Sequence, residues 1–144
     1  TLFMCAGSIY VATRKTNISQ MTGLGRAMPI TFIAFLIGSL SIIGLPPLGG
    51  SWSKWFLIMG AADTGQLAII GVLLISSLLN VAYLLPLVGK GFFLKPVNET
   101  KPTKFAESPT LVWAPPAFTA CGCIILFFLA GHIQAFLMPI IAAP

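Results

Sequence analysis

Residues 66–88 constrain the fold of this chain more than any other stretch, because they read QLAIIGVLLISSLLNVAYLLPLV without a single charge. A helix needs about 20 apolar residues to cross the hydrocarbon core of a bilayer. The same character extends through the chain, in which 57% of the residues are apolar and only 8% are charged. A typical soluble domain has about 25% charged residues, and so few charges cannot cover the surface of one this long. The sequence therefore predicts an all-α integral membrane protein.

Other apolar stretches flank this span, and together they predict a bundle of transmembrane helices that forms one membrane domain over 1–144. Residues 1–12 carry no charge but are too short to cross the membrane. We therefore expect a truncated span there, and a chain that is the C-terminal part of a longer protein. The remaining predicted spans lie at 29–62, 66–88 and 111–131.

The stretch 29–62 is too long for one straight span, too short for two full spans, and contains GLPPLGGS at 44–51. Proline removes a backbone donor, and glycine weakens a helix. We therefore expect one discontinuous helix, with halves at about 30–45 and about 52–62 joined by an irregular segment. The residues that produce this break are Gly44, Pro46, Pro47, Gly49 and Gly50.

Most of the basic residues lie in two polar connections, 13–28 and 90–110. Cytoplasmic loops of membrane proteins carry an excess of Lys and Arg. If 29–62 crosses the membrane once, both connections fall on the same side, and if it crosses twice they fall on opposite sides. The rule favours one broken crossing with both connections in the cytoplasm, and we expect a bacterial-type plasma membrane.

Several functions are disfavoured by the residues that the chain lacks. The net charge of +5 comes from the connections and not from a basic face interleaved with aromatic residues, so we expect no nucleic acid partner. Cys5, Cys121 and Cys123 have no His or carboxylate cluster beside them in the sequence, so we expect no metal site. No haem ligand pair or nucleotide fingerprint is present, and we expect no cofactor and no electron transfer in this chain.

Lys54 is the most informative single residue, because it lies within an apolar span just after the expected break. The next charged residue is Asp63, about 13 Å further along a helix, and a lysine side chain can reach only part of that way. A charge at this depth costs roughly 3 kcal/mol and usually faces the protein interior or a hydrated cavity. Two interpretations remain: a lysine that carries protons, or one that snorkels or sets the topology.

Polar residues elsewhere in the spans suggest a pathway. Ser77 and Asn80 are three residues apart and share a helix face in the middle of 66–88. They would make hydrogen bonds between helices or take part in a water wire. His132 lies at the end of the last span, as a proton relay or as an interfacial histidine.

The stretch GLGRAMPITFIAFLIGSLSIIGLPPLGGSWSKW, residues 23–55, resembles the C-terminal half of the antiporter-like membrane subunits. This family includes the large proton-pumping subunits of respiratory complex I and relatives in Mrp-type cation/proton antiporters and membrane-bound hydrogenases. The order GLGR, MP, GLPP and G-x-x-SK is specific to it. Residues 76–93 look most like the D-type subunit of the Mrp antiporters.

The resemblance implies two inverted repeats, each with one broken helix, of which the second break matches 44–51. The family's lysine after that break matches Lys54, which would pass protons toward the exit half-channel; some members have Glu there. The family's His and Lys four residues apart, its Glu–Lys pair and its first repeat have no counterpart here, which implies a C-terminal fragment.

The resemblance therefore implies proton translocation within a multisubunit complex, either NADH:quinone oxidoreductase-like or of the Mrp antiporter type. The partners would be other membrane subunits, the lipid bilayer, protons and, in an antiporter, sodium. The alternative is a structural or assembly subunit without transport, although a charge such as Lys54 is costly to keep without use. The resemblance fits a subunit of complex I, of an Mrp-type antiporter or of a hydrogenase-type complex.

Overall fold

The computed structural model describes residues 1–14, 17–18, 21–94 and 107–141 of the chain. Within these residues the regular structure is entirely helical, which confirms the predicted all-α class. The helices are α1 (Leu2–Thr13), α2 (Leu24–Ala27), α3 (Pro29–Ile43), α4 (Gly49–Asp63), α5 (Leu67–Phe93) and α6 (Thr110–Ile141).

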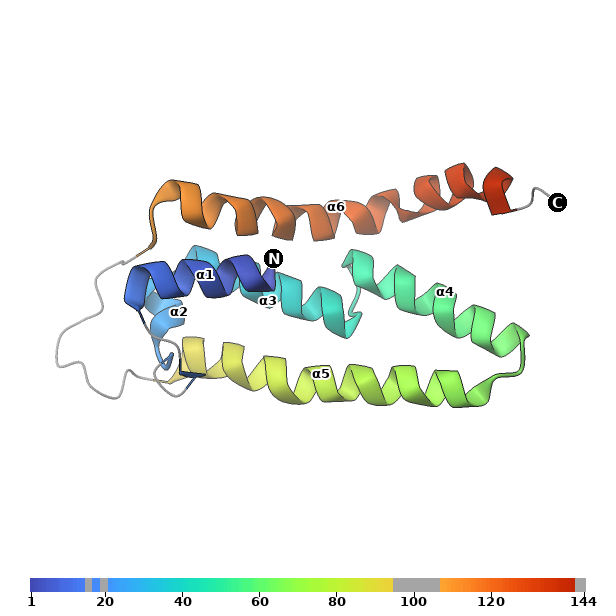
Figure 1. Cartoon of the computed structure of the whole chain (residues 1–144), viewed down its shortest axis with the longest axis horizontal. Helices are drawn as coiled ribbons and strands as arrows, with labels where there is room; N and C mark the ends of the chain where they lie inside the picture. The colour runs from blue at the N-terminus through green and yellow to red at the C-terminus, as the bar shows by residue number, and fades with distance from the viewer. Residues whose placement is uncertain (15–16, 19–20, 95–106, 142–144) are drawn as a thin grey trace.

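The helices form one elongated bundle (Figure 1). α5 and α6 lie along its two long edges, with α1, α3 and α4 between them. α3 packs against α1, α5 and α6, and α4 packs against α5 and α6. α3 and α4 follow one another along the length of α5, and together they form the predicted discontinuous helix.

The break between α3 and α4 is shorter than the sequence suggests. α3 starts with Pro29, whose missing N–H is no loss in a first turn, and it ends where Gly44 adopts a left-handed φ of 92°. Gly49 and Gly50 were expected within the break, but they form the first turn of α4 after an extended Leu48. Their small size has another use, since a Cβ on Gly50 would lie 1.8 Å from the Ser41 carbonyl oxygen.

Two other helices are longer than expected. α5 continues past residue 88 to Phe93 and contains Pro86 within its length. α6 continues past residue 131 to Ile141, and Pro139 does not end it. Proline is tolerated inside transmembrane helices, where neighbouring groups compensate for the lost hydrogen bond. The middle of the predicted connection 90–110, with Lys95, Glu99, Lys101 and Lys104, lies outside the described residues.

The bundle has two halves that differ in how far their side chains are buried. The buried core lies where α1, α2, α3, the end of α5 and the start of α6 meet, and we call this half the packed end. Its buried apolar side chains are Cys5, Ile9, Leu24, Ala27, Met28, Phe32, Ala34, Phe35, Leu84, Val88 and Ala120. The other half consists of α4 with residues 67–83 and 121–138, and we call it the open end. Ala61 is the only buried residue of α4.

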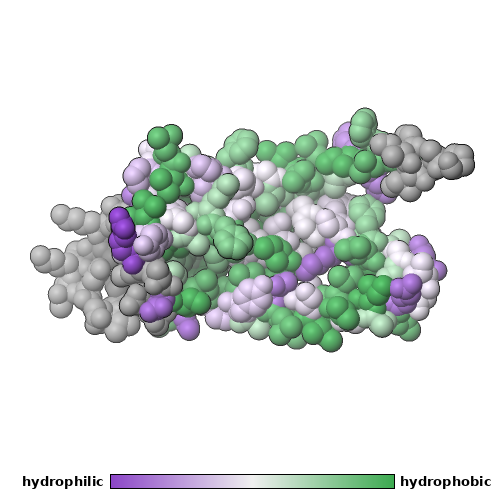
Figure 2. Space-filling view, in the orientation of Figure 1, coloured by the Kyte–Doolittle hydropathy of each residue, from purple (hydrophilic) through white to green (hydrophobic). Residues whose placement is uncertain are grey.

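The exposed surface is largely apolar, as a bilayer requires. Figure 2 shows apolar side chains along most of the visible face, with hydrophilic ones toward the ends and a smaller group about halfway along. Leu67–Phe93 and Thr110–Met138 are each long and apolar enough to cross a membrane. Leu2–Thr13 and Pro29–Ile43 are shorter apolar helices. Composition and helix lengths together identify an integral membrane protein.

Candidate functional site

The break leaves the end of α3 with carbonyl groups that lack partners within the helix, as every helix end does. Gly44 turns back and donates its N–H to the carbonyl oxygens of Leu40 and Ser41, at 3.0 and 3.2 Å. Leu45 donates to Leu40 as well, at 3.1 Å. The carbonyl oxygen of Ile43 instead accepts a hydrogen bond from the ammonium of Lys54, with 2.8 Å between Nζ and oxygen.

Lys54 itself lies in the second turn of α4 and is half-buried. Its Nζ also donates to the hydroxyl of Ser77 on α5, over 2.6 Å. Ser77 in turn donates to the Leu73 carbonyl oxygen, one turn earlier in α5, over 3.0 Å. The ammonium therefore joins the end of α3 to the middle of α5, and two of its three N–H donors are occupied.

Gly44 provides the space for this arrangement. A Cβ at this position would lie 2.8 Å from Cδ of Lys54, closer than real Cβ contacts come. The left-handed φ of 92° also disfavours any residue with a side chain. Gly44 therefore serves two purposes: it ends α3, and it lets the lysine stem pass beside the turn.

The other polar residues predicted for a pathway do not join this site directly. Asn80 lies on the same face of α5 as Ser77 and accepts a hydrogen bond from the hydroxyl of Tyr83. His132 is exposed on α6 and makes no hydrogen bond with another described residue. The structure thus brings Lys54 and Ser77 together, and leaves Asn80 and His132 apart from them. Tyr83 was not selected from the sequence as a polar partner, although its position three residues after Asn80 places the two side chains on one helix face.

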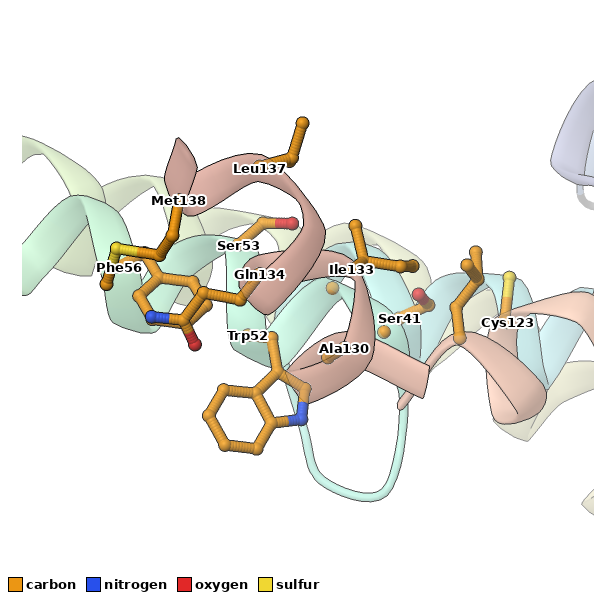
Figure 3. Close-up of a pocket in the computed structure, with 13 residues that line it drawn as sticks. Ser41, Trp52, Ser53, Phe56, Cys123, Ala130, Ile133, Gln134, Leu137 and Met138 are labelled. Carbon is orange, nitrogen blue, oxygen red and sulfur yellow. The ribbon is translucent and has the colours of Figure 1, made fainter. Parts of the chain in front are cut away.

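A cavity of about 740 Å³ lies beside the start of α4, between α4 and α6 (Figure 3). Trp52, Ser53 and Phe56 line it from α4, and Cys123, Ile133 and Gln134 are among the residues that line it from α6. Most of the lining side chains labelled in Figure 3 are apolar. Lys54 is not among its lining residues. The cavity and the ammonium site are therefore distinct features of α4.

A polar cluster at the packed end was also missed from the sequence. Glu107 accepts hydrogen bonds from the Ile30 backbone N–H, at 2.8 Å, and from the Thr31 hydroxyl, at 2.9 Å. The Thr31 and Ser8 hydroxyls are 3.3 Å apart, and Ser8 also bonds the hydroxyl of Ser108. The carboxylate supplies the N-terminal cap that Met28 cannot give α3. Because Glu107 is 77 residues from Ile30 in the chain, no local pattern reveals this contact.

The three cysteines lie apart from the ammonium site. Cys5 is buried at the packed end, Cys121 is exposed and Cys123 is half-buried, and all have free thiols. Among the residues that the structure describes, no three His, Cys, Asp or Glu side chains come together in a way that could hold a metal ion.

Comparison with known proteins gives a consistent result. The family model described as NADH:quinone oxidoreductase/Mrp antiporter, transmembrane, matches residues 1–80. The chain is 31% identical over 133 residues to NADH-quinone oxidoreductase subunit 14 of Thermus thermophilus, which covers 92% of this chain and 29% of that protein. It is 34% identical over 125 residues to subunit L of Rickettsia typhi, covering 81% of this chain and 19% of that protein.

Subunit N of Desulforudis audaxviator is 40% identical over 82 residues, covering 57% of this chain and 16% of that protein. The chain thus spans less than a third of the length of each of these relatives. The comparison with solved structures found no match.

Proposed function

This chain belongs to the NADH:quinone oxidoreductase/Mrp antiporter family of membrane subunits, and we propose that it forms part of a proton route in which Lys54 is the proton carrier. The route would lie within a multisubunit complex whose other membrane subunits complete it. The break of the discontinuous helix, residues 44–48, would place the carrier inside the membrane.

The observation that carries this proposal is the surroundings of the Lys54 ammonium. Its partners are the Ile43 carbonyl and the Ser77 hydroxyl, both neutral. No carboxylate pairs with it among the described residues. A buried ion pair is strongly destabilised when one partner loses its charge. Neutral partners impose no such penalty, so Lys54 can lose and regain a proton without leaving an opposite charge behind.

The direction of the proposed route follows from the basic residues. α1 and α5 both end, and α2 lies, at one end of the bundle (Figure 1). Arg26 of α2 donates its Nε–H to the Phe92 carbonyl oxygen of α5, over 3.0 Å, so the two predicted connections meet there. With that end in the cytoplasm, Lys54 would take a proton from the hydrated interior and release it toward the opposite side. The free energy would come from quinone reduction or a cation gradient elsewhere in the complex.

The test is Lys54→Met in the complete membrane complex that contains this chain. Proton movement into everted vesicles is followed with a pH-sensitive dye, energised by NADH and, separately, by added sodium. We expect the variant signal to fall close to that of vesicles without the complex, at unchanged abundance, because Met matches the lysine stem but has no proton to give. Lys90→Met, at the end of α5, is the matched control and should keep the wild-type signal.

The two energy sources separate the alternatives. Loss of the NADH-driven signal indicates an oxidoreductase complex, and loss of only the sodium-driven signal indicates an antiporter. If both signals survive in Lys54→Met, the carrier role is wrong, and the chain is a structural or assembly subunit.

A further inference from the structure

We propose that Ser77 is a positioning residue that holds the Lys54 nitrogen in the same place whether or not it carries its third proton. This inference rests on the proposed function, since it matters only if Lys54 exchanges protons. It assigns to one hydroxyl of α5 a role that changes with the state of the carrier.

With Lys54 charged, the two observed hydrogen bonds of its ammonium each pair a donor with an acceptor. The ammonium has only donors, and Ser77 Oγ accepts one of them at 2.6 Å. The hydroxyl hydrogen of Ser77 is then directed elsewhere, to the Leu73 carbonyl oxygen at 3.0 Å. The Ser77 hydroxyl therefore accepts from the ammonium and donates to the Leu73 carbonyl at the same time.

With Lys54 neutral, the requirement at Nζ changes. An amine keeps two N–H donors and gains one lone pair, which needs a donor. The Ile43 carbonyl can only accept, so among the described residues bonded to Lys54, Ser77 alone has a hydrogen to give. Rotation of its hydroxyl away from Leu73 supplies that hydrogen. Ser77 keeps its own proton throughout; the proton that leaves Lys54 goes to the next acceptor on the route.

An ordinary serine in a membrane helix would bond only to the carbonyl four residues earlier. Ser39 of α3 does this, donating to Phe35 at 2.8 Å. Ser77 makes the same kind of bond, and its hydroxyl oxygen also accepts a hydrogen bond from the Lys54 ammonium. Its neighbour Ser76 is exposed on another face of α5 and makes no side-chain hydrogen bond with a described residue. Ser76 is therefore a matched control one position away.

The experiment compares Ser77→Ala, Ser77→Thr and Ser76→Ala in the same complete complex and vesicle assay. Losing one hydrogen bond to a charged group should slow proton movement roughly tenfold in Ser77→Ala. Ser77→Thr keeps a hydroxyl that can reach the carbonyl four residues earlier, so it should restore most of the wild-type rate. Ser76→Ala should match the wild type.

A double variant separates positioning from structure. With Lys54→Met already present, adding Ser77→Ala should change neither the abundance nor the thermal midpoint of the complex, because its partner is gone. If Ser77→Ala lowers either quantity equally in both backgrounds, the hydroxyl is structural and the inference is overturned. If Lys54→Met abolishes proton movement while Ser77→Ala leaves it unchanged, the inference falls and the proposed function stands. If Lys54→Met itself has no effect, both fall.

Discussion

The packed end and the open end of this bundle both contain long apolar helices, yet they bury side chains to very different degrees. Phe32 at the packed end is 1% exposed, whereas Phe136 at the open end is 76% exposed. Because lipid tails are as apolar as Leu or Phe, apolar character alone does not drive helices together in a membrane. The comparison shows that hydropathy places these helices in the bilayer without deciding which of them pack.

Some glycines of the bundle lie at close contacts between helices, and others face open space. At the packed end Gly25 approaches the backbone of Gly91, and a Cβ on Gly91 would lie 2.2 Å from the Phe32 ring. At the open end a Cβ on Gly60 or on Gly71 would have nothing within 4 Å. Close backbone approach therefore accompanies the packing of α2 and α3 against the end of α5. Glycines facing open space at the other end mark surfaces available to lipid or to other helices of the complex.

The largest expected effect tests this contrast directly with a pair of phenylalanines. Phe32→Ala removes a ring that lies edge-on to Phe92 with centroids 5.9 Å apart, and it should lower the free energy of unfolding by about 3 kcal/mol. Phe136→Ala should change it by less than about 0.5 kcal/mol. The thermal midpoint of the detergent-solubilised complex measures both. Equal losses would show that protein, not lipid, covers the open end.

A second pair of variants tests the close approach of Gly50 in α4 to Ser41 in α3. Gly50→Ala places a Cβ against the Ser41 carbonyl oxygen and should cost about 2 kcal/mol through overpacking. Gly60→Ala lies in the same helix with open space around it, and should be neutral or stabilise by about 0.5 kcal/mol. The same thermal measurement applies. An undiminished midpoint in Gly50→Ala would mean that α4 does not approach α3 this closely.

The smallest expected effect compares two carboxylates at helix ends. Glu107→Gln weakens the bonds to Ile30 and Thr31 at the start of α3, and should cost about 1 kcal/mol because a negative charge is favourable there. Asp63→Asn, at the end of α4, should cost nothing or stabilise slightly, since a negative charge is unfavourable at a helix C-terminus. Chemical denaturation of both variants resolves such a difference. A larger loss of stability in Asp63→Asn than in Glu107→Gln would mean that the charge at the end of α4 is the stabilising one, and not the charge at the start of α3.

The sequence predicted the features that depend on local composition. The uncharged run 66–88 is long enough to cross a bilayer, and α5 covers it from Leu67 onward. Pro46 and Pro47 cannot continue a helix, and they lie between α3 and α4. Such features need only neighbouring residues, so they can be inferred without knowing what packs where.

Features that depend on distant residues were not predictable in the same way. Gly49 and Gly50 suit a break by composition, but their place in α4 is decided by the close approach to Ser41. Lys54 and Ser77 were both selected as polar residues, but their contact spans 23 positions and depends on how α4 packs on α5. The position of Glu107 at the start of α3 likewise has no local signature.

The hydrogen bond from Lys54 to Ile43 has a mechanical consequence for the segment between them. The backbone joins α3 to α4 through residues 44–48, and the lysine side chain joins them a second time over a distance of 2.8 Å. These two connections close a loop, so α3 and α4 cannot change their angle freely while the side chain remains attached. The Lys54 side chain therefore restrains the angle between α3 and α4 as long as its ammonium is bonded to the Ile43 carbonyl oxygen.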